Sequence, residues 1–232
     1  MKYNKVIKGE FIDRPNRFIA HVKIEEDKIE TVHVKNTGRC RELLLPGARV
    51  ILEVSDNPNR KTKYDLITVW KEGLGWVNVD SQAPNVIVKE WLLSGKSIFG
   101  NVRHLKPEYS YGDSRVDFYL ECEAKDEKSG ELYTRKILIE VKGCTLEIDG
   151  KGYFPDAPTS RGVKHLKELT AAVKKGYECY IAFAITMPVV GEVLPNESTD
   201  PSFATAFYEA KAAGVGILNL ACEVTEDTLK IL

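Results

Sequence analysis

The segment ILIEVKG, residues 137–143, raises the question whether the polar face of one strand is ordinary solvent-exposed surface or a functional site. Its first three residues are apolar and β-prone, as in a central strand of a sheet. Glu140 and Lys142 follow, two residues apart, and alternate residues of a strand share one face. An acid and a base therefore lie side by side on a strand that begins like a core strand.

The segment SRVDFYLECE, residues 114–123, is expected to form a hairpin with TRKILIEVK, residues 134–142. A turn centred between Lys128 and Ser129 makes the numbers of opposed residues sum to 257, which sets Asp117 opposite Glu140. The Cβ atoms of such a pair are about 4.5–5.5 Å apart. The polar face then carries Arg115, Asp117, Tyr119, Glu140 and Lys142, and the apolar face carries Val116, Phe118, Leu120, Ile137, Ile139 and Val141.

Two carboxylates at that distance repel each other unless a proton or a cation lies between them. Mg²⁺ takes oxygen ligands and suits such a pair. The pattern predicts a metal site made by Asp117 and Glu140, with the main-chain carbonyl of Val141 as a further ligand. The matching chemistry is metal-assisted phosphodiester hydrolysis, in which Lys142 orients the attacking water or contacts the phosphate. The alternative is an ordinary charged outer face, since Glu-x-Lys also occurs at 123–125 and 209–211.

Three groups of basic residues are candidates for contacts with a phosphate backbone. One lies at the start of an expected helix, where main-chain amides also favour phosphate. The groups are Arg161, Lys164 and His165 at that helix, Arg39 and Arg41 in NTGRCREL, and Arg60, Lys61 and Lys63 in a loop between strands. For each group the alternative is a solvated, ion-paired surface, and a lone histidine such as His165 is more often structural than functional.

The spacing of apolar residues changes near residue 80. Residues 1–80 alternate apolar and polar residues, with turn signals at 14–16 and 26–28, and predict a small closed β-barrel of the oligonucleotide-binding (OB) type. Residues 81–232 add helices between strands and predict an α/β domain over a mixed sheet, so that the whole chain is α+β/α/β. The expected helices run from a cap at Asn85 to Gly95, from Thr159 or Ser160 to about Lys175, and from Asp200 through Ala213. A buried strand is expected at 177–186 and a last strand at 215–224.

Composition fits an ordinary globular protein, with 43% hydrophobic and 29% charged residues. The net charge of −1 does not by itself indicate a nucleic-acid partner. Residues 1–80 carry 15 Lys and Arg against 12 Asp and Glu, a net of +3, whereas residues 81–232 carry 18 against 22, a net of −4. An acidic half can still act on nucleic acid where its carboxylates hold cations.

The five cysteines are scattered and include no Cys-x-x-Cys pair, which predicts reduced and mostly buried thiols. No apolar run is long enough to span a bilayer, and the first residues are not followed by a signal-peptide core. A cytoplasmic location without a membrane partner is therefore expected.

Four linked motifs resemble the sugar fermentation stimulation protein A family: VKNTGRCRELLLPG, EYSYGDSRVDF, IEVKGCTL and YFPDAPTSRGVKHLKEL. They follow one another at the spacings of that family over nearly the whole chain. The resemblance implies an OB-like barrel over residues 1–80 and, over residues 81–232, a domain similar to the restriction-endonuclease-like PD-(D/E)XK nucleases. It implies the same reactive residues as the hairpin, namely Asp117, Glu140 and Lys142.

The same resemblance adds Glu108, in EYSYG, as a further metal-binding or structural acid. Arg115 matches the arginine of the family's Ser-Arg-x-Asp-Phe segment, and Arg161 and His165 match its Thr-x-Arg-Gly-x-x-His-Leu segment. Arg115 therefore joins the residues expected to contact nucleic acid. The family is described as DNA-binding and as linked to the expression of sugar-use genes.

These features favour a nucleic-acid-binding protein that cleaves phosphodiester bonds of DNA or RNA with Mg²⁺ or Mn²⁺. The main alternative is a non-catalytic DNA-binding regulator of sugar-utilisation genes that keeps the nuclease-like fold. A third alternative is a small-molecule or carbohydrate-linked protein whose polar strand face is structural. Assembly into a homodimer is left open.

Overall fold

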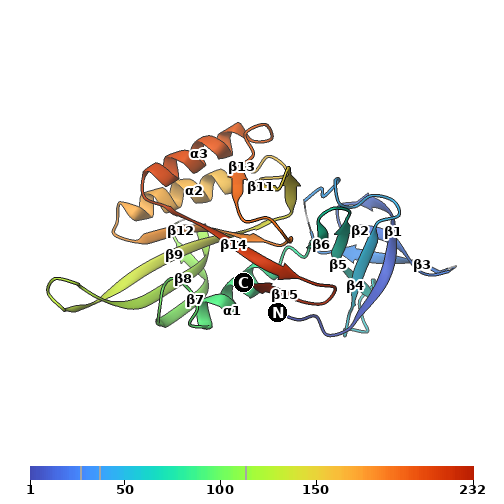
Figure 1. The fold of residues 1–232 in the computed structure, drawn as a ribbon, viewed down its shortest axis with the longest axis horizontal. Coiled ribbons are helices and arrows are strands. Elements are labelled where there is room, and N and C mark those ends of the chain that lie inside the picture. The colour runs from blue at the N-terminus through green and yellow to red at the C-terminus, as the bar shows by residue number, and fades with distance from the viewer. Residues whose placement is uncertain (27, 37, 113) are drawn as a thin grey trace.

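The computed structural model describes residues 1–26, 28–36, 38–112 and 114–232. Asp27, Thr37 and Asp113 lie outside the described residues, and with them parts of the predicted turn at 26–28 and of two of the quoted motifs. The first six strands are β1 (Val6–Asn16), β2 (Ile19–Glu25), β3 (Lys28–Val34), β4 (Arg49–Val54), β5 (Tyr64–Lys71) and β6 (Gly75–Asn78). They form one sheet in the order β3-β2-β1-β4-β5-β6, and a parallel pairing of β3 with β5 closes five of them into the predicted barrel (Figure 1).

The rest of the chain forms a mixed sheet with three helices, as predicted. Its elements are α1 (Ala83–Leu93), β7 (Val102–Tyr111), β8 (Ser114–Lys125), β9 (Leu132–Cys144), β10 (Leu146–Ile148), β11 (Lys151–Phe154), α2 (Ser160–Val173), β12 (Glu178–Ile185), β13 (Val193–Pro195), α3 (Pro201–Ala212), β14 (Gly216–Val224) and β15 (Leu229–Ile231). The large sheet has the order β15-β14-β12-β9-β8-β7, in which β12 is parallel to both of its neighbours. A small sheet, β10-β11-β13, lies beside it.

Strand β9 is central, and its residues alternate between two apolar cores on opposite faces of the sheet. Ile137 and Ile139 pack in the core that includes Ile87 of α1, and Leu138 packs in the core that includes Leu166 of α2. Figure 1 shows α2 and α3 together over one face and α1 at the other. Burial on both faces explains why ILI is an unbroken apolar run rather than an alternating one.

Two of the helices begin at the predicted caps. Thr159 Oγ1 accepts a hydrogen bond from the Gly162 amide at 3.0 Å, and Asp200 Oδ1 accepts one from the Phe203 amide at 2.9 Å. Each contact satisfies an amide that has no partner within its helix. These two predicted helix starts are confirmed.

The predicted start of α1 is wrong. The helix begins at Ala83, with a proline in its first turn, so that Asn85 lies inside the helix rather than at its cap. The Asn85 side chain donates instead to Asp117 on β8. The Asn85 side chain therefore binds a residue distant in sequence instead of capping the helix.

The strand β7 and the position of Val116 also differ from expectation. Strand β7 was not predicted because it is an edge strand whose side chains are mostly exposed and which contains Pro107. Val116 was assigned to the face of Phe118, but it packs in the opposite core, with Leu138 and Leu166. The pairing of β8 with β9 ends at Phe118, so residues before it are free to turn away from the β9 register.

The barrel and the mixed-sheet domain are joined by apolar and polar contacts. One continuous apolar cluster contains barrel residues such as Val77 and Val79 and sheet residues such as Phe183 and Ile185. The Asn78 amide donates to the Thr186 carbonyl at 2.9 Å, and Thr186 Oγ1 donates to the Asn78 carbonyl at 2.8 Å. At the start of the chain, the Met1 amino group donates to the Leu229 carbonyl, so the two termini lie close together (Figure 1).

All five cysteines are buried and unbridged, which confirms the prediction of reduced thiols. Within the part of the chain that the structure describes, no helix has the length and apolar character needed to cross a membrane.

Candidate active site

Asp117 and Glu140 lie where the β8–β9 hairpin opens. The paired residues run from Lys125 with Leu132 to Phe118 with Ile139, and every pair of numbers sums to 257, so the predicted register is confirmed over this stretch. The predicted pairing of Asp117 with Glu140 on one face is wrong, because strand pairing ends at Phe118 and the two acids are held by helices on opposite faces of the sheet. Beyond the last pair, Asp117 Oδ2 accepts a hydrogen bond from the Val141 amide at 2.7 Å. The Asp117 carboxylate thus binds a main-chain amide of β9 just beyond the last main-chain pair of the two strands.

A second contact fixes Asp117. Asn85 of α1 donates from Nδ2 to Asp117 Oδ1 at 2.9 Å. Helix α1 can approach the end of β9 this closely because residue 143 is glycine: a Cβ there would lie 2.9 Å from Cγ of Pro84. Pro84 and Asn85 are neighbours, so this close approach brings the amide side chain to the acid.

Glu140 is held from the opposite face of the sheet. His165 of α2 contacts Glu140 Oε1 through Nδ1, and Lys142 Nζ contacts the same oxygen at 2.5 Å. Arg161 Nε donates to His165 Nε2 at 3.4 Å, which leaves Nδ1 to carry the hydrogen that is donated to Glu140. Glu140 is only 3% exposed, so these partners supply most of the compensation for burying its charge.

The two carboxyl groups have pKa values shifted in opposite directions. Burial, reinforced by the nearby charge of Glu140, raises the pKa of Asp117. Burial also acts to raise the pKa of Glu140, but the hydrogen bond from His165 and the charge of Lys142 outweigh it and lower that pKa. Glu140 is therefore held as an anion, and its charge opposes ionisation of Asp117.

This donor set fits a hard divalent cation. Both side chains offer carboxylate oxygens, and a cation between them would offset the charge of Glu140, which adds to the effect of burial in raising the pKa of Asp117. In the described parts of the chain, no three acidic, histidine or cysteine side chains gather as a ready-made metal cluster. A metal held here would need ligands besides the two carboxylates, such as the Val141 carbonyl, water or a phosphate oxygen.

Glu108 is not gathered with the two acids. It is exposed on β7 and has a positive φ of 49°, which is uncommon for a residue with a side chain. Its neighbours Pro107 and Tyr109 pair with Phe118 and Val116, so the Glu108 backbone lies across from Asp117. Its role as a metal ligand stays a prediction.

Four of the predicted phosphate-contacting residues line one open cleft of about 540 Å³ beside Glu140. Arg115 comes from β8, and Arg161, Lys164 and His165 come from the first two turns of α2. Residues near the β7–β8 turn complete the lining: Ser110, Gly112 and Ser114. We name this depression the basic cleft, and His165 connects it directly to Glu140.

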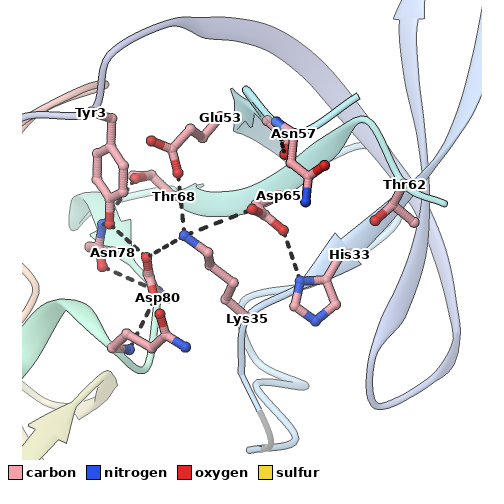
Figure 2. Close-up of polar contacts among 12 residues, drawn as sticks. Tyr3, His33, Lys35, Glu53, Asn57, Thr62, Asp65, Thr68, Asn78 and Asp80 are labelled. Atoms are coloured by element: carbon pink, nitrogen blue, oxygen red, sulfur yellow. Dashed lines mark hydrogen bonds and ion pairs between the residues drawn. The ribbon is translucent and has the colours of Figure 1, made fainter. Parts of the chain in front are cut away.

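The other predicted phosphate-contacting residues belong to the barrel and do not join the basic cleft. Arg39 and Arg41 line a separate depression. Arg60 instead forms hydrogen bonds of 2.7 and 2.6 Å to the buried Asp65. His33 and Lys35, both half-buried, also contact Asp65 (Figure 2). Lys61 and Lys63 are exposed.

Two residues that support these sites, Asn85 and Arg14, were not predicted from the sequence. Asn85 was interpreted as a helix cap, and nothing local shows that its amide reaches Asp117. Arg14 forms hydrogen bonds from its guanidinium to four main-chain carbonyls, those of Arg17, Asn36, Gly38 and Arg39, and thereby orders the loop that carries Arg39 and Arg41. The segment Arg14-Pro15-Asn16 had indicated only a turn.

The barrel and the mixed sheet define a protein of a particular class: an OB-type domain followed by a restriction-endonuclease-like domain. Two family models match the chain. The model described as "SfsA N-terminal OB domain" matches residues 12–79, and the model described as "Sugar fermentation stimulation protein RE domain" matches residues 82–228. The chain belongs to the sugar fermentation stimulation protein family.

Individual relatives agree with this assignment. A sugar fermentation stimulation protein homolog of Desulfitobacterium hafniense is 50% identical over 99% of this chain and 95% of that protein. One of Clostridium beijerinckii is 49% identical over 100% and 96%. The solved structure of Pyrococcus furiosus SfsA in complex with Ca²⁺ is 28% identical, has a TM-score of 0.81, and covers 100% of this chain and 95% of that one.

Proposed function

We propose that this protein binds nucleic acid and hydrolyses its phosphodiester bonds with Mg²⁺ or Mn²⁺ at Asp117 and Glu140. The observation that carries the proposal is the pair of acids at the open end of the hairpin, with Lys142 in contact with one of them. A purely structural polar face has no need of a buried acid, Glu140, beside a half-buried acid, Asp117, whose ionisation it opposes. The basic cleft beside Glu140 supplies cationic groups for the phosphate backbone.

The roles of the side chains follow from their contacts. Asn85 and the Val141 amide orient Asp117, and His165 orients Glu140. When bound, a divalent ion would neutralise charge on the phosphate and favour the attacking form of water. Lys142 would leave its contact with Glu140 for the phosphate or the water, since the ion would then balance the Glu140 charge.

A relative supports the divalent ion. The Pyrococcus furiosus SfsA structure is a complex with Ca²⁺, which is a hard, oxygen-seeking cation of the same kind as Mg²⁺. We propose that Asp117, Glu140 and the Val141 carbonyl hold the ion in this chain, with Glu108, whose backbone lies across from Asp117, as a further ligand.

The test is cleavage of labelled single- and double-stranded DNA and RNA by the full chain in Mg²⁺ or Mn²⁺. We expect EDTA to abolish cleavage, and Asp117→Ala, Glu140→Gln and Lys142→Ala each to reduce its rate by about 100-fold or more, because each removes charge stabilisation in the transition state. Glu123→Gln and Lys136→Ala are matched controls on the same hairpin, with exposed side chains, and should cleave normally.

Cleavage that survives EDTA or all three substitutions would contradict the proposal. Binding of oligonucleotides with no cleavage under any metal condition would instead favour the DNA-binding regulator. In that case the acids would be an inherited feature of the fold.

A further inference from the structure

A second cleft, of about 500 Å³, lies between the barrel and the mixed-sheet domain. We name it the interdomain cleft. Its barrel wall includes Arg17, Asn36 and Arg39, and its other wall includes Thr145, Phe154 and Asp156. The predicted phosphate contacts of the basic cleft do not line it, so the two clefts are separate.

The interdomain cleft extends close to Asp117, Glu140 and Lys142, which together we name the acid face. Gly143 and Pro84 both line it, and these residues adjoin Lys142 and Asn85 respectively. Thr159, which caps α2, also lines it, and the same helix carries His165 into the basic cleft. Neighbours of Lys142 and Asn85 therefore line one cleft, His165, which holds Glu140, lines the other, and both clefts reach the start of α2.

The charged side chains that line the interdomain cleft balance one another. Its two arginines are matched by two acids, Asp80 and Asp156, and Asp80 is itself bound to Lys35 and Tyr3 (Figure 2). Most of the remaining polar groups are uncharged amides and hydroxyls, and apolar surface comes from Phe154 and several prolines. Flat apolar faces with both donors and acceptors at the edge are the features of a nucleobase.

The barrel wall of this cleft is formed in advance. The Arg14 guanidinium donates hydrogen bonds to three carbonyls of the loop around Arg39, and the Arg39 amide donates to Asp156 Oδ2 at 3.2 Å. Gly38 allows this approach, because a Cβ there would lie 2.8 Å from the same oxygen. Ligand binding at such a site does not have to order the loop first.

We infer that the interdomain cleft receives one unpaired base of the strand whose phosphodiester lies at the acid face. The inference rests on the proposed function, because it takes the strand held at Asp117 and Glu140 as the ligand. A volume of this size lies within the range of about 300–1,000 Å³ that holds a drug-sized molecule, and it admits one nucleoside but no duplex. The preferred substrate is therefore single-stranded or locally unpaired nucleic acid, with Arg17 and Arg39 at the adjoining phosphates.

The test is binding of fluorescent single-stranded and duplex oligonucleotides of equal length to the full chain, measured by anisotropy in EDTA so that no cleavage occurs. We expect at least 10-fold tighter binding of the single strand. Ala157→Trp, which fills the cleft, should remove that preference, and Arg39→Glu should weaken single-strand binding by about 10-fold through a lost phosphate contact. Lys128→Glu, at the exposed hairpin turn far along the chain from either cleft, is the charge-reversal control and should bind normally.

The outcomes separate this inference from the proposed function. Equal or tighter binding of the duplex, or no effect of either cleft variant, overturns the inference even if the protein is a nuclease. A single-strand preference lost in Ala157→Trp and Arg39→Glu supports it even if no metal condition gives cleavage. Circular dichroism of each variant establishes folding, and Arg39→Glu decides the matter if Ala157→Trp is unfolded, because the Arg39 side chain is exposed.

Discussion

At the scale of single residues, the site depends on how two neighbouring acids are held. Glu140 has two cationic or hydrogen-donating partners on one oxygen, whereas Asp117 has only neutral amides within hydrogen-bond distance. This difference explains the lowered pKa of Glu140 and the raised pKa of Asp117. The acid–base pair was predictable from strand periodicity, but Asn85 and His165 as its supports were not, because they come from helices distant in sequence.

His165 offers a direct test of that support. We expect His165→Ala to weaken Mn²⁺ binding and the cleavage rate by about 10–100-fold, since removing a group that orients a metal ligand has this effect. Calorimetric titration with Mn²⁺ measures the first quantity without requiring cleavage. Lys167→Ala, exposed on the same helix, is the control. Unchanged metal affinity in His165→Ala would show that Glu140 does not depend on this contact.

A second residue-scale prediction concerns acid stability. Burial acts to raise the pKa of Asp65, but hydrogen bonds from Arg60 and His33 and the charge of Lys35 outweigh it, so this pKa is lowered. A carboxyl group whose pKa is lower in the folded state stabilises the fold above its unfolded pKa of about 3.9, and this stabilisation is lost as pH falls through the folded pKa. The difference between wild type and Asp65→Asn should therefore be greatest at neutral pH.

Urea unfolding from pH 7 to pH 3 measures this difference. We expect Asp65→Asn to cost about 1–3 kcal/mol at pH 7, because charged hydrogen bonds are lost, and the gap to wild type to close as acid is added. Asp56→Asn, exposed in the neighbouring loop, should change neither the stability nor its pH dependence. A gap that stays constant to pH 3 would contradict the assignment of Asp65 as the titrating group.

At the scale of elements, strand pairing was more predictable than helix ends. Two opposed β-prone segments around one turn leave few registers that keep the apolar residues inside, and the register summing to 257 is the one observed. Strand β7 and the start of α1 could not be predicted in this way. Both depend on tertiary partners: β7 pairs with β8 while most of its side chains stay in water, and α1 is positioned by Asn85 and Pro84.

Asp200 joins two elements and gives the element-scale prediction. Its Oδ1 caps α3 through the Phe203 amide, and its Oδ2 accepts from the Thr159 amide at the start of α2. Asp200→Ala should lower the free energy of unfolding by about 1–3 kcal/mol, because the Phe203 and Thr159 amides both lose their hydrogen-bond acceptor. Asp200→Asn keeps an oxygen for the cap and should cost clearly less. If urea unfolding gave the same loss of stability for Asp200→Ala and Asp200→Asn, the hydrogen bond to the Thr159 amide would account for the whole effect.

At the scale of the whole molecule, the two domains share one apolar cluster and a reciprocal pair of hydrogen bonds between Asn78 and Thr186. Joint unfolding is expected, because separating the domains would expose part of that cluster. The described helices all lie in the mixed-sheet domain, whereas Trp70 and Trp76 lie in the barrel. The third tryptophan, Trp91, lies on α1, so fluorescence is measured in a Trp91→Phe background. In that background tryptophan fluorescence follows the barrel, whereas helical circular dichroism follows the mixed-sheet domain.

We expect the two signals to change at the same urea concentration. Thr186→Val keeps the side-chain shape but leaves the buried Asn78 carbonyl without this donor, and should lower the stability of both domains together by about 1–3 kcal/mol. Thr170→Val, which removes a hydroxyl contact within α2, is the matched control and should have a smaller effect. Two separate transitions in the Trp91→Phe protein would contradict this coupling.

The sequence by itself determined the barrel, the mixed sheet, the hairpin register and the chemical character of Asp117, Glu140 and Lys142. These depend on local periodicity and on the pairing of adjacent strands, which nearby residues specify. The tertiary structure decided which groups hold the two acids, which basic residues gather beside them, and that a cleft lies between the domains. Those features depend on side chains that approach from separate elements, and their distances are set by close packing of the whole chain rather than by any local pattern.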